Sequence, residues 1–382
     1  MDNASGAPVD ERVIEAMLPY FTVDSGNPSS LHTSGINARK ALESARGSVA
    51  SLVGAESREI IFTSGGTESN NLALRGAAFR KKKKGNHIIT TTIEHMSVVN
   101  TCKDLQREGF EVSTVPVDKD GLLDVERIRQ EITDKTILIS VMYANGEIGT
   151  IQPVGNIGEI AREKDIVFHV DGVAACGRIP VDVQRDNIDL LSIASNDLYG
   201  PKGVGALYVR AGVPLRPMIT GGGQERGLRS GSENIPGIVG FAKACAIAKE
   251  EMGNDSGKMT EIRDRLIEGI LGSIRHSYLT GHRTKRLPNI ASFRFSFIEG
   301  ESIILGLNDL QVEASTGSAC SVKTLEPSHV LMAIGLRHEE AHGSLLLSLN
   351  RWSTLEEADY VIENLPHVVD RLRELSPLYP GD

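Results

Sequence analysis

The sequence predicts an α/β protein with a large domain, built on a mostly parallel sheet covered by helices, and a smaller α+β domain. Short apolar runs alternate with longer segments of helical periodicity, which is the pattern of buried parallel strands joined by helical crossovers. The chain has 382 residues, of which 40% are hydrophobic and 24% are charged. It is therefore long enough to form more than one hydrophobic core.

The predicted elements of the large domain follow one another in a regular order. Segments of helical periodicity at residues 11–20 and 38–53 come first. Apolar runs are then expected to form strands at residues 60–62, 87–92, 136–142, 166–170 and 190–193. A helix is expected at residues 70–80, and the basic run at 80–84 should form its solvated C-terminal end.

The pattern changes near residue 258, where we expect the smaller domain to begin. A helix is predicted at residues 259–274, strands at 289–297, a helix at 301–307, and another helix opening at 326–329. We therefore expect a large α/β domain at residues 13–257, and a small α+β domain formed by residues 1–12 and 258–382.

The composition excludes several classes of function. A formal net charge of −9 argues against a nucleic-acid-binding protein, which would carry a basic face. No apolar run has the length of a membrane span and the first residues lack a signal-peptide core, so a cytoplasmic protein without a membrane partner is expected. The cysteines are widely spaced without a C-x-x-C pair, which argues against a disulfide framework.

Polar clusters follow the predicted strands, where ligands bind in parallel sheets. The first is the glycine-rich segment 63–68, which opens a helix with Thr67 as its expected cap and therefore predicts a phosphate site. The alternative is a plain capped turn. Further clusters come at residues 94–95, 145–149, 169–172 and 196–203. Any one of these could be structural, but the set favours a functional site.

A second candidate feature is Cys320, which lies in a run of small residues at 314–321. Small polar residues with a glycine predict a loop, and loops held by a rigid scaffold often carry function. The local sequence leaves two interpretations open. Cys320 is either a reactive thiol or an inert buried cysteine.

Several motifs occur in the order and spacing of one known family. They are Asp2-Asn3-Ala4, GNPSS at 26–30, TSGGTE at 63–68, EH at 94–95, NGEIG at 145–149, YGPKG at 199–203, GGG at 221–223 and SAC at 318–320. Over essentially its whole length the chain resembles the cysteine desulfurases of the NifS/IscS type. The resemblance implies the pyridoxal phosphate (PLP) transferase fold of type I, a homodimer with sites at the subunit interface, and sulfur delivery to an iron–sulfur scaffold protein.

The resemblance also implies roles for individual residues. Those assigned to cofactor binding are Gly66 and Thr67 at the phosphate, Ser232 reaching the phosphate of the other subunit, Asn145 beside the ring, Asp171 at the ring nitrogen, and Asn196 beside the position of the Schiff-base lysine. The catalytic residues would be His95 on the ring and Cys320 as persulfide carrier.

The chain departs from the family at four positions. The family's Schiff-base lysine is replaced by Asp197, and a carboxylate cannot form the Schiff base that an amine forms. Lys202, five residues later, is not expected to substitute for it. The glutamine that faces the phenolic oxygen is Ala174, and the arginine that binds the substrate carboxylate is Leu346. Ala194 takes the place of a phosphate-binding serine.

These losses remove covalent cofactor attachment and amino-acid binding, while Cys320 remains. We therefore predict a desulfurase-like protein of iron–sulfur cluster assembly that pairs with an IscU-type scaffold. Cys320 would serve as a sulfur acceptor or as a ligand of a shared [2Fe-2S] cluster, without normal PLP-dependent desulfuration.

Two alternatives remain open from the sequence. The first is an active PLP-dependent cysteine desulfurase that converts L-cysteine to L-alanine and a persulfide on Cys320, with the cofactor held noncovalently. The second is a structural subunit whose C-terminal residues 372–379 dock a partner.

Overall fold

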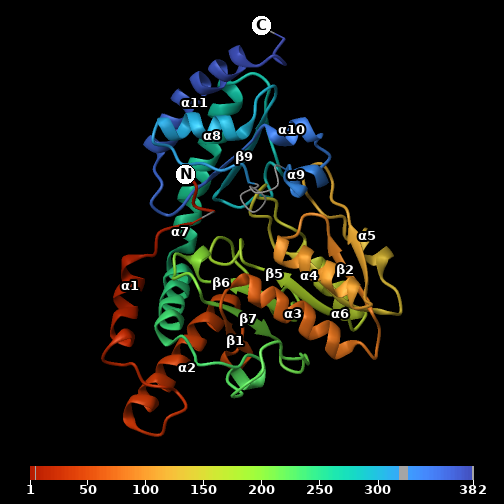
Figure 1. The fold of residues 1–382 in the computed structure, drawn as a ribbon, viewed down its shortest axis with the longest axis vertical. Helices are drawn as coiled ribbons and strands as arrows, with labels where there is room; N and C mark the ends of the chain where they lie inside the picture. Colours follow the sequence, from red (N-terminus) through yellow and green to blue (C-terminus); the bar gives the residue numbers. More distant parts are fainter. Residues whose placement is uncertain (5, 318–325, 381–382) are drawn as a thin grey trace.

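The structure is a computed structural model, and it describes residues 1–4, 6–317 and 326–380. Figure 1 shows a large lower domain around one sheet and a smaller upper domain around another. The larger sheet has seven strands in the order β1-β7-β6-β5-β4-β2-β3, and the smaller has three in the order β10-β9-β8. The predicted α/β class with a mostly parallel main sheet is confirmed.

The main sheet is arranged so that the carboxyl ends of all its strands except β7 meet at one edge. Its strands are β1 (Ile60–Thr63), β2 (His87–Thr91), β3 (Glu111–Val115), β4 (Thr136–Met142), β5 (Val167–Asp171), β6 (Leu190–Ala194) and β7 (Gly205–Val209). Strand β7 is antiparallel to both of its neighbours, and the remaining pairs are parallel. The other six strands therefore run in one direction.

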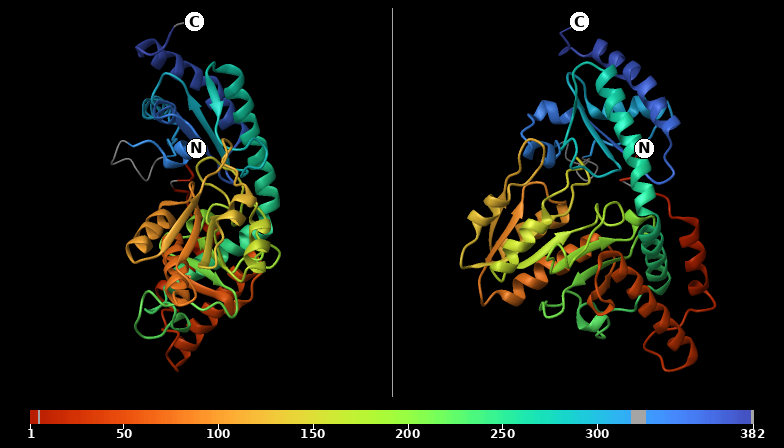
Figure 2. Two further views of the ribbon diagram at one scale, coloured as in Figure 1. Left: turned by 90° about the vertical axis from the view of Figure 1, so that its right-hand side faces the viewer. Right: turned by 180° about the vertical axis from the view of Figure 1, so that it is seen from behind.

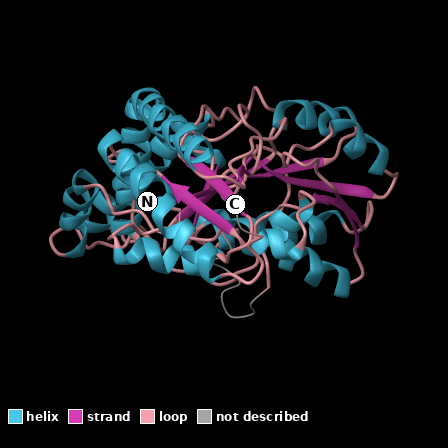
Figure 3. Cartoon of the chain, turned by 90° about the horizontal axis from the view of Figure 1, so that it is seen from above, coloured by secondary structure: helices cyan, strands magenta, loops and turns pink. Residues whose placement is uncertain are grey.

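Helices cover both faces of this sheet, as Figure 3 shows. They are α1 (Glu11–Met17), α2 (Thr33–Val53), α3 (Gly66–Lys81), α4 (Met96–Arg107), α5 (Val125–Glu131) and α6 (Val154–Glu163). Successive side chains of β1 enter different cores, because Ile60 and Phe62 pack with α2 while Ile61 packs with α3 and α4. The continuous apolar strands thus bury both faces.

The small domain forms its own core above the end of a long helix. Helix α7 (Ile235–Ser273) has 39 residues and runs from one domain into the other, as Figure 2 shows. It is followed by β8 (Ser277–Leu279), β9 (Ile290–Phe295), α8 (Gly300–Asp309), α9 (His329–Ala333), α10 (His338–His342), β10 (Ser344–Ser348) and α11 (Leu355–Leu375). A separate apolar cluster begins at Met259 and ends at Val369.

The domain boundary expected after residue 257 falls inside α7, and the division stays a prediction. The N-terminal arm lies along the edge of the small sheet. The backbone N–H of Asn3 donates to the carbonyl of Ser348 at 3.4 Å, and Met1 packs against the small-domain cluster.

Some elements differ from the sequence-based expectations. Strands β3 and β7 and the first half of α7 were not predicted. Strand β3 is a partly exposed edge strand without an apolar run, and glycines interrupt the periodicity of α7. Helix α3 is capped by Gly65 instead of Thr67, which lies inside its first turn. Short 3₁₀ turns occur at Leu18–Phe21, Ser57–Glu59, Asn196–Leu198 and Glu225–Gly227.

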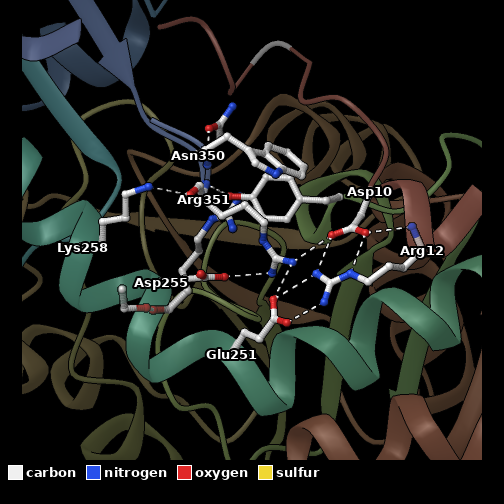
Figure 4. Close-up of polar contacts among 11 residues, drawn as sticks. Asp10, Arg12, Glu251, Asp255, Lys258, Asn350 and Arg351 are labelled. Carbon is white, nitrogen blue, oxygen red and sulfur yellow. Dashed lines mark hydrogen bonds and ion pairs between the residues drawn. The ribbon is translucent and has the colours of Figure 1, made fainter. Parts of the chain in front are cut away.

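An arginine of the small domain joins several segments next to the main sheet, as Figure 4 shows. The guanidinium of Arg351 pairs with Asp10 of the N-terminal arm at 3.1 Å, and with Glu251 and Asp255 of α7 at 3.0 and 2.9 Å. It also lies 4.7 Å from the ring centroid of Tyr199, whose hydroxyl accepts a hydrogen bond from the Arg351 backbone N–H. Arg351 therefore fixes the loop after β6 against both domains.

Among the described residues, none of the helices combines the length and apolar character needed to traverse a lipid bilayer.

Candidate functional site

The sequence-predicted site residues lie at the carboxyl edge of the main sheet. Gly66 follows β1, His95 follows β2, Asn145 follows β4, Asp171 ends β5 and Asn196 follows β6. Because these strands run in one direction, their ends meet at one edge. Site residues that are far apart in the sequence, from Gly66 to Asn196, are thereby brought to one edge of the sheet.

The N-terminus of α3 is open towards an anion. Its cap, Gly65, has no side chain to satisfy the first N–H groups of the helix, which include those of Gly66 and Thr67. A Cβ on Gly66 would lie 2.7 Å from Cγ2 of Val173 and 3.7 Å from Cβ of Ala194. Glycine is required at position 66 because the loop after β5 approaches the backbone so closely.

A chain of hydrogen bonds joins the predicted ring-nitrogen partner to His95. The amide nitrogen Nδ2 of Asn70 donates to Oδ2 of Asp171 at 2.7 Å and to Oγ of Ser97 at 2.8 Å. Oγ of Ser97 lies 2.7 Å from Nδ1 of His95. The other carboxylate oxygen of Asp171 accepts the backbone N–H of Val173 at 3.1 Å. The carboxylate is therefore held in place from two elements.

His95 caps helix α4, and this hydrogen bond orients its ring. Its Nδ1 accepts the backbone N–H of Ser97 at 3.1 Å, so Nδ1 carries no proton. In the neutral imidazole the proton is then on Nε2. The exposed ring of His95 thus presents a donor, Nε2–H, at the site.

Asp197 is the most unusual residue of the site. It is partly buried, and burial, opposed by the nearby Arg178 and helped by Asp171, raises its pKa to about 6. Its Oδ2 accepts a hydrogen bond from Nδ2 of Asn196 at 2.8 Å. Lys202 is exposed, and its Nζ lies 3.4 Å from where a Cβ on Gly6 would stand. Lys202 is therefore directed towards the N-terminal arm.

The side-chain amide of Asn145 forms hydrogen bonds with the backbone around it. Its Oδ1 accepts the backbone N–H groups of Glu147 and Ile148, both at 2.9 Å, and its Nδ2 donates to the carbonyl of Ile93 at 2.9 Å. These bonds shape the turn after β4. Its predicted contact with a cofactor ring stays a prediction.

The segments that flank residues 318–325 approach Glu147, which is partly buried, and Glu94, which is buried. A Cβ on Gly317 would lie 2.5 Å from Cγ of Glu147, which also bonds Ser328. Nε2 of His329 lies 2.9 Å from the carbonyl oxygen of Glu94. Burial raises the pKa of Glu147 to about 7 and that of Glu94 to about 8.

Cys320 itself lies outside the described residues. The other cysteines, Cys102, Cys176 and Cys245, are buried free thiols. Burial raises the pKa of Cys102 to about 12 and the pKa values of Cys176 and Cys245 as well. Since the thiolate is the nucleophile and metal ligand, none of these three is suited to sulfur chemistry.

Three other positions that the resemblance assigns to the site are occupied by the apolar residues Leu346 and Ala174 and by the exposed Ser232. Leu346 is 3% exposed and packs in the main core with Leu287 and Ile290. Ala174 lies against Gly146, where a Cβ would be 3.6 Å away. Ser232 is exposed in the loop before α7, and its predicted reach into another subunit stays a prediction.

Several site residues were absent from the sequence-based predictions. Asn70 lies one turn into α3 and Ser97 is the second residue of α4, and only the packing of these helices brings Asn70 to both Ser97 and Asp171. Another omission is the H-E-x-x-H spacing at residues 338–342, which the sequence itself displays. The rings of His338 and His342 lie 4.6 Å apart, but no group of three or more metal-ligating side chains occurs within the described ranges.

The fold and the site define a protein of the PLP-dependent transferase class. Residues 1–361 match the family described as Aminotransferase class-V, so the chain belongs to this family. Within it the chain belongs with the cysteine desulfurases of the IscS type. It is 57% identical to "Cysteine desulfurase IscS 1" of Archaeoglobus fulgidus, over 99% of this chain and 98% of that protein.

Further relatives agree. "Cysteine desulfurase IscS" of Methanosarcina thermophila is 52% identical over 100% of this chain and 94% of its own length. A solved structure described as a NifS-like protein superposes with a TM-score of 0.91 at 39% identity, covering 97% of this chain and 99% of that one.

The residues fit only part of the cofactor that the family implies. The open end of α3 and the carboxylate of Asp171 suit a phosphate and a protonated ring nitrogen. Position 197, which the family resemblance assigns to the Schiff-base lysine, holds a carboxylate, and a carboxylate cannot form the covalent bond that an amine forms. The site therefore does not fit a covalently bound PLP.

Proposed function

We propose that this protein is a desulfurase-like component of iron–sulfur cluster assembly that does not carry out normal PLP-dependent desulfuration. It acts as a homodimer with an IscU-type scaffold, and Cys320 serves as sulfur acceptor or as ligand of a shared [2Fe-2S] cluster. The observation that carries this proposal is the aspartate at position 197.

Two further positions support the loss of the PLP reaction. Leu346 is buried in the core and offers no partner to a substrate carboxylate, which arginine binds through two parallel hydrogen bonds. Ala174 offers no polar group to the ring oxygen of a cofactor. These changes affect cofactor attachment and substrate binding together.

The role of Cys320 is supported by its contrast with the other cysteines. The buried thiols at positions 102, 176 and 245 are held in the protonated form, which neither attacks sulfur nor binds iron. Gly317 and Ser328 lie on either side of the Cys320 segment; the backbone of Gly317 passes close to Glu147, and Ser328 forms a hydrogen bond with it.

The proposal is tested by anaerobic co-purification with an IscU-type scaffold. Cys320→Ala is expected to lower the iron and sulfide content of the complex and to change its absorbance spectrum. Cys102→Ala, at a buried cysteine, is the matched control and should leave both unchanged. An unchanged cluster in the Cys320→Ala complex would refute the role of this thiol.

The second candidate is an active, noncovalent PLP-dependent cysteine desulfurase. It is favoured by the retained hydrogen-bond chain from Asp171 to His95 and by the relatives, which are named as cysteine desulfurases. This candidate requires alanine to form from cysteine when PLP is added, and a colourless protein without turnover excludes it.

A further inference from the structure

The charged groups around Asp197 leave an excess of negative charge. Burial, and the nearby Asp171, raise the pKa of Asp197, and Arg178 is the cation that opposes this shift; burial and both carboxylates also raise the pKa of the Cys176 thiol. Nδ1 of His95 is occupied, because it accepts the backbone N–H of Ser97. Cys176, next to both carboxylates, is a protonated thiol. Two carboxylates against one guanidinium leave one net negative charge.

Asp197 also has unused capacity for hydrogen bonding. Asn196 donates to its Oδ2, and within the described parts of the chain no second donor reaches the carboxylate. Arg178 contributes its charge from a stacked position, 4.4 Å from the ring centroid of Tyr199, without a hydrogen bond to Asp197. A carboxylate in such surroundings is stabilised by a cationic donor.

Two other groups at the same edge of the sheet define what else a ligand would carry. The free N–H groups at the start of α3 suit a phosphate. The carboxylate of Asp171, oriented by Asn70 and the backbone of Val173, suits a protonated aromatic nitrogen. A complementary ligand therefore has an anionic end and a cationic end.

We propose that this site binds an aminated pyridine phosphate of the pyridoxamine type noncovalently, with the ammonium group of the ligand on Asp197. The ring end of such a ligand carries a pyridinium, an ammonium and a phenolate, which sum to one positive charge. The aldehyde form lacks the ammonium, so its ring end is neutral. The single negative charge of the protein site is thus matched by the amine and left uncompensated by the aldehyde.

The replacement of a lysine by an aspartate then exchanges which molecule supplies the amine. In the family the protein supplies the amine and the cofactor supplies the group that receives it. Here the protein supplies a carboxylate, and the amine comes with the ligand. No bond forms or breaks in this binding step.

Calorimetric titration of the full-length protein tests this proposal. The probes are pyridoxamine 5′-phosphate, pyridoxal 5′-phosphate and pyridoxine 5′-phosphate, which has a neutral hydroxyl in place of the ammonium group. The amine form should bind at least about tenfold more tightly than either of the others, as expected for a charge-assisted hydrogen bond.

Two isosteric variants separate the roles of the carboxylates. Asp197→Asn should weaken binding of the amine form by about 10- to 100-fold and abolish the preference, whereas Asp171→Asn should weaken all three ligands and retain it. Equal affinities in the unaltered protein, a preference that survives Asp197→Asn, or failure of all three ligands to bind would overturn the proposal.

This inference concerns the ligand of the site, and the proposed function concerns Cys320. The two fail separately, because the titration is carried out without scaffold or iron and the co-purification is scored by cluster content.

Discussion

Replacement of Arg351 by methionine should destabilise the protein strongly, because its guanidinium is the shared partner of several carboxylates. Its side chain is 7% exposed, and it pairs with Asp10, which is also 7% exposed, and with Asp255, which is 13% exposed. Asp10 and Glu251 keep their ion pairs with Arg12 in this variant, but Asp255 loses its partner, and removal of one partner from a buried ion pair costs about 3–5 kcal/mol. We expect a loss of this size in the free energy of unfolding.

Arg12→Met provides the matched control within the same network. Arg12 is the main cause that lowers the pKa of Asp10 to about 2, yet its side chain is 46% exposed. Water competes for an exposed guanidinium, so its pair with Asp10 should contribute only about 0–1 kcal/mol. Burial is therefore the better guide to the relative cost of the two substitutions.

The measurement is urea unfolding of both variants at one protein concentration, followed by circular dichroism. A cost for Arg351→Met that is no larger than that of Arg12→Met would refute the assignment of Arg351 as the residue that joins the two domains. Retention of the unaltered protein's stability in Arg351→Met would refute it as well.

Three further predictions concern the site. Burial raises the pKa of Glu94 from 4.5 to about 8, so the folded state holds a proton that the unfolded state releases in this pH interval. The free energy of unfolding should therefore fall by about 1.4 kcal/mol per pH unit as the pH rises across the interval. Glu94→Gln should flatten this slope in urea titrations, and an unchanged slope would contradict the shift. Asp197→Lys should restore PLP absorbance more than turnover, because the buried Leu346 still offers no partner to a substrate carboxylate, and full turnover from this change alone would contradict the role of Leu346. Gly317→Ala should lower the melting temperature, because Gly317 has a φ of +74° and its Cβ would meet Cγ of Glu147 at 2.5 Å, whereas Gly109→Ala, at a φ of +89° with no atom within 4 Å, is the milder control.

The central strands could be predicted from the sequence because each is a continuous apolar run buried on both faces. Strand β4 was predicted with its observed limits. The edge strand β3 was not predicted, since only its last residue is fully buried and polar residues interrupt its two valines. The long helix α7 was predicted only in its second half because glycines weaken its periodicity.

The candidate site was predictable where one motif carries it, as at Gly66 and Asp171. It was not predictable where tertiary packing joins distant residues. Asn70 reaches Asp171 across 101 positions of sequence, and Arg351 reaches Tyr199 across 152. Neither residue has a local signal, because a polar residue on a helix or an arginine after a strand is common in any fold.

The central claim is that a carboxylate at position 197 prevents normal desulfuration, and alanine formation tests it most directly. The purified protein is incubated anaerobically with L-cysteine, added PLP and a thiol reductant, and L-alanine is quantified against a protein-free control. We predict no alanine above the control. Alanine formed in molar excess over the protein, and abolished by Cys320→Ala, would contradict the claim.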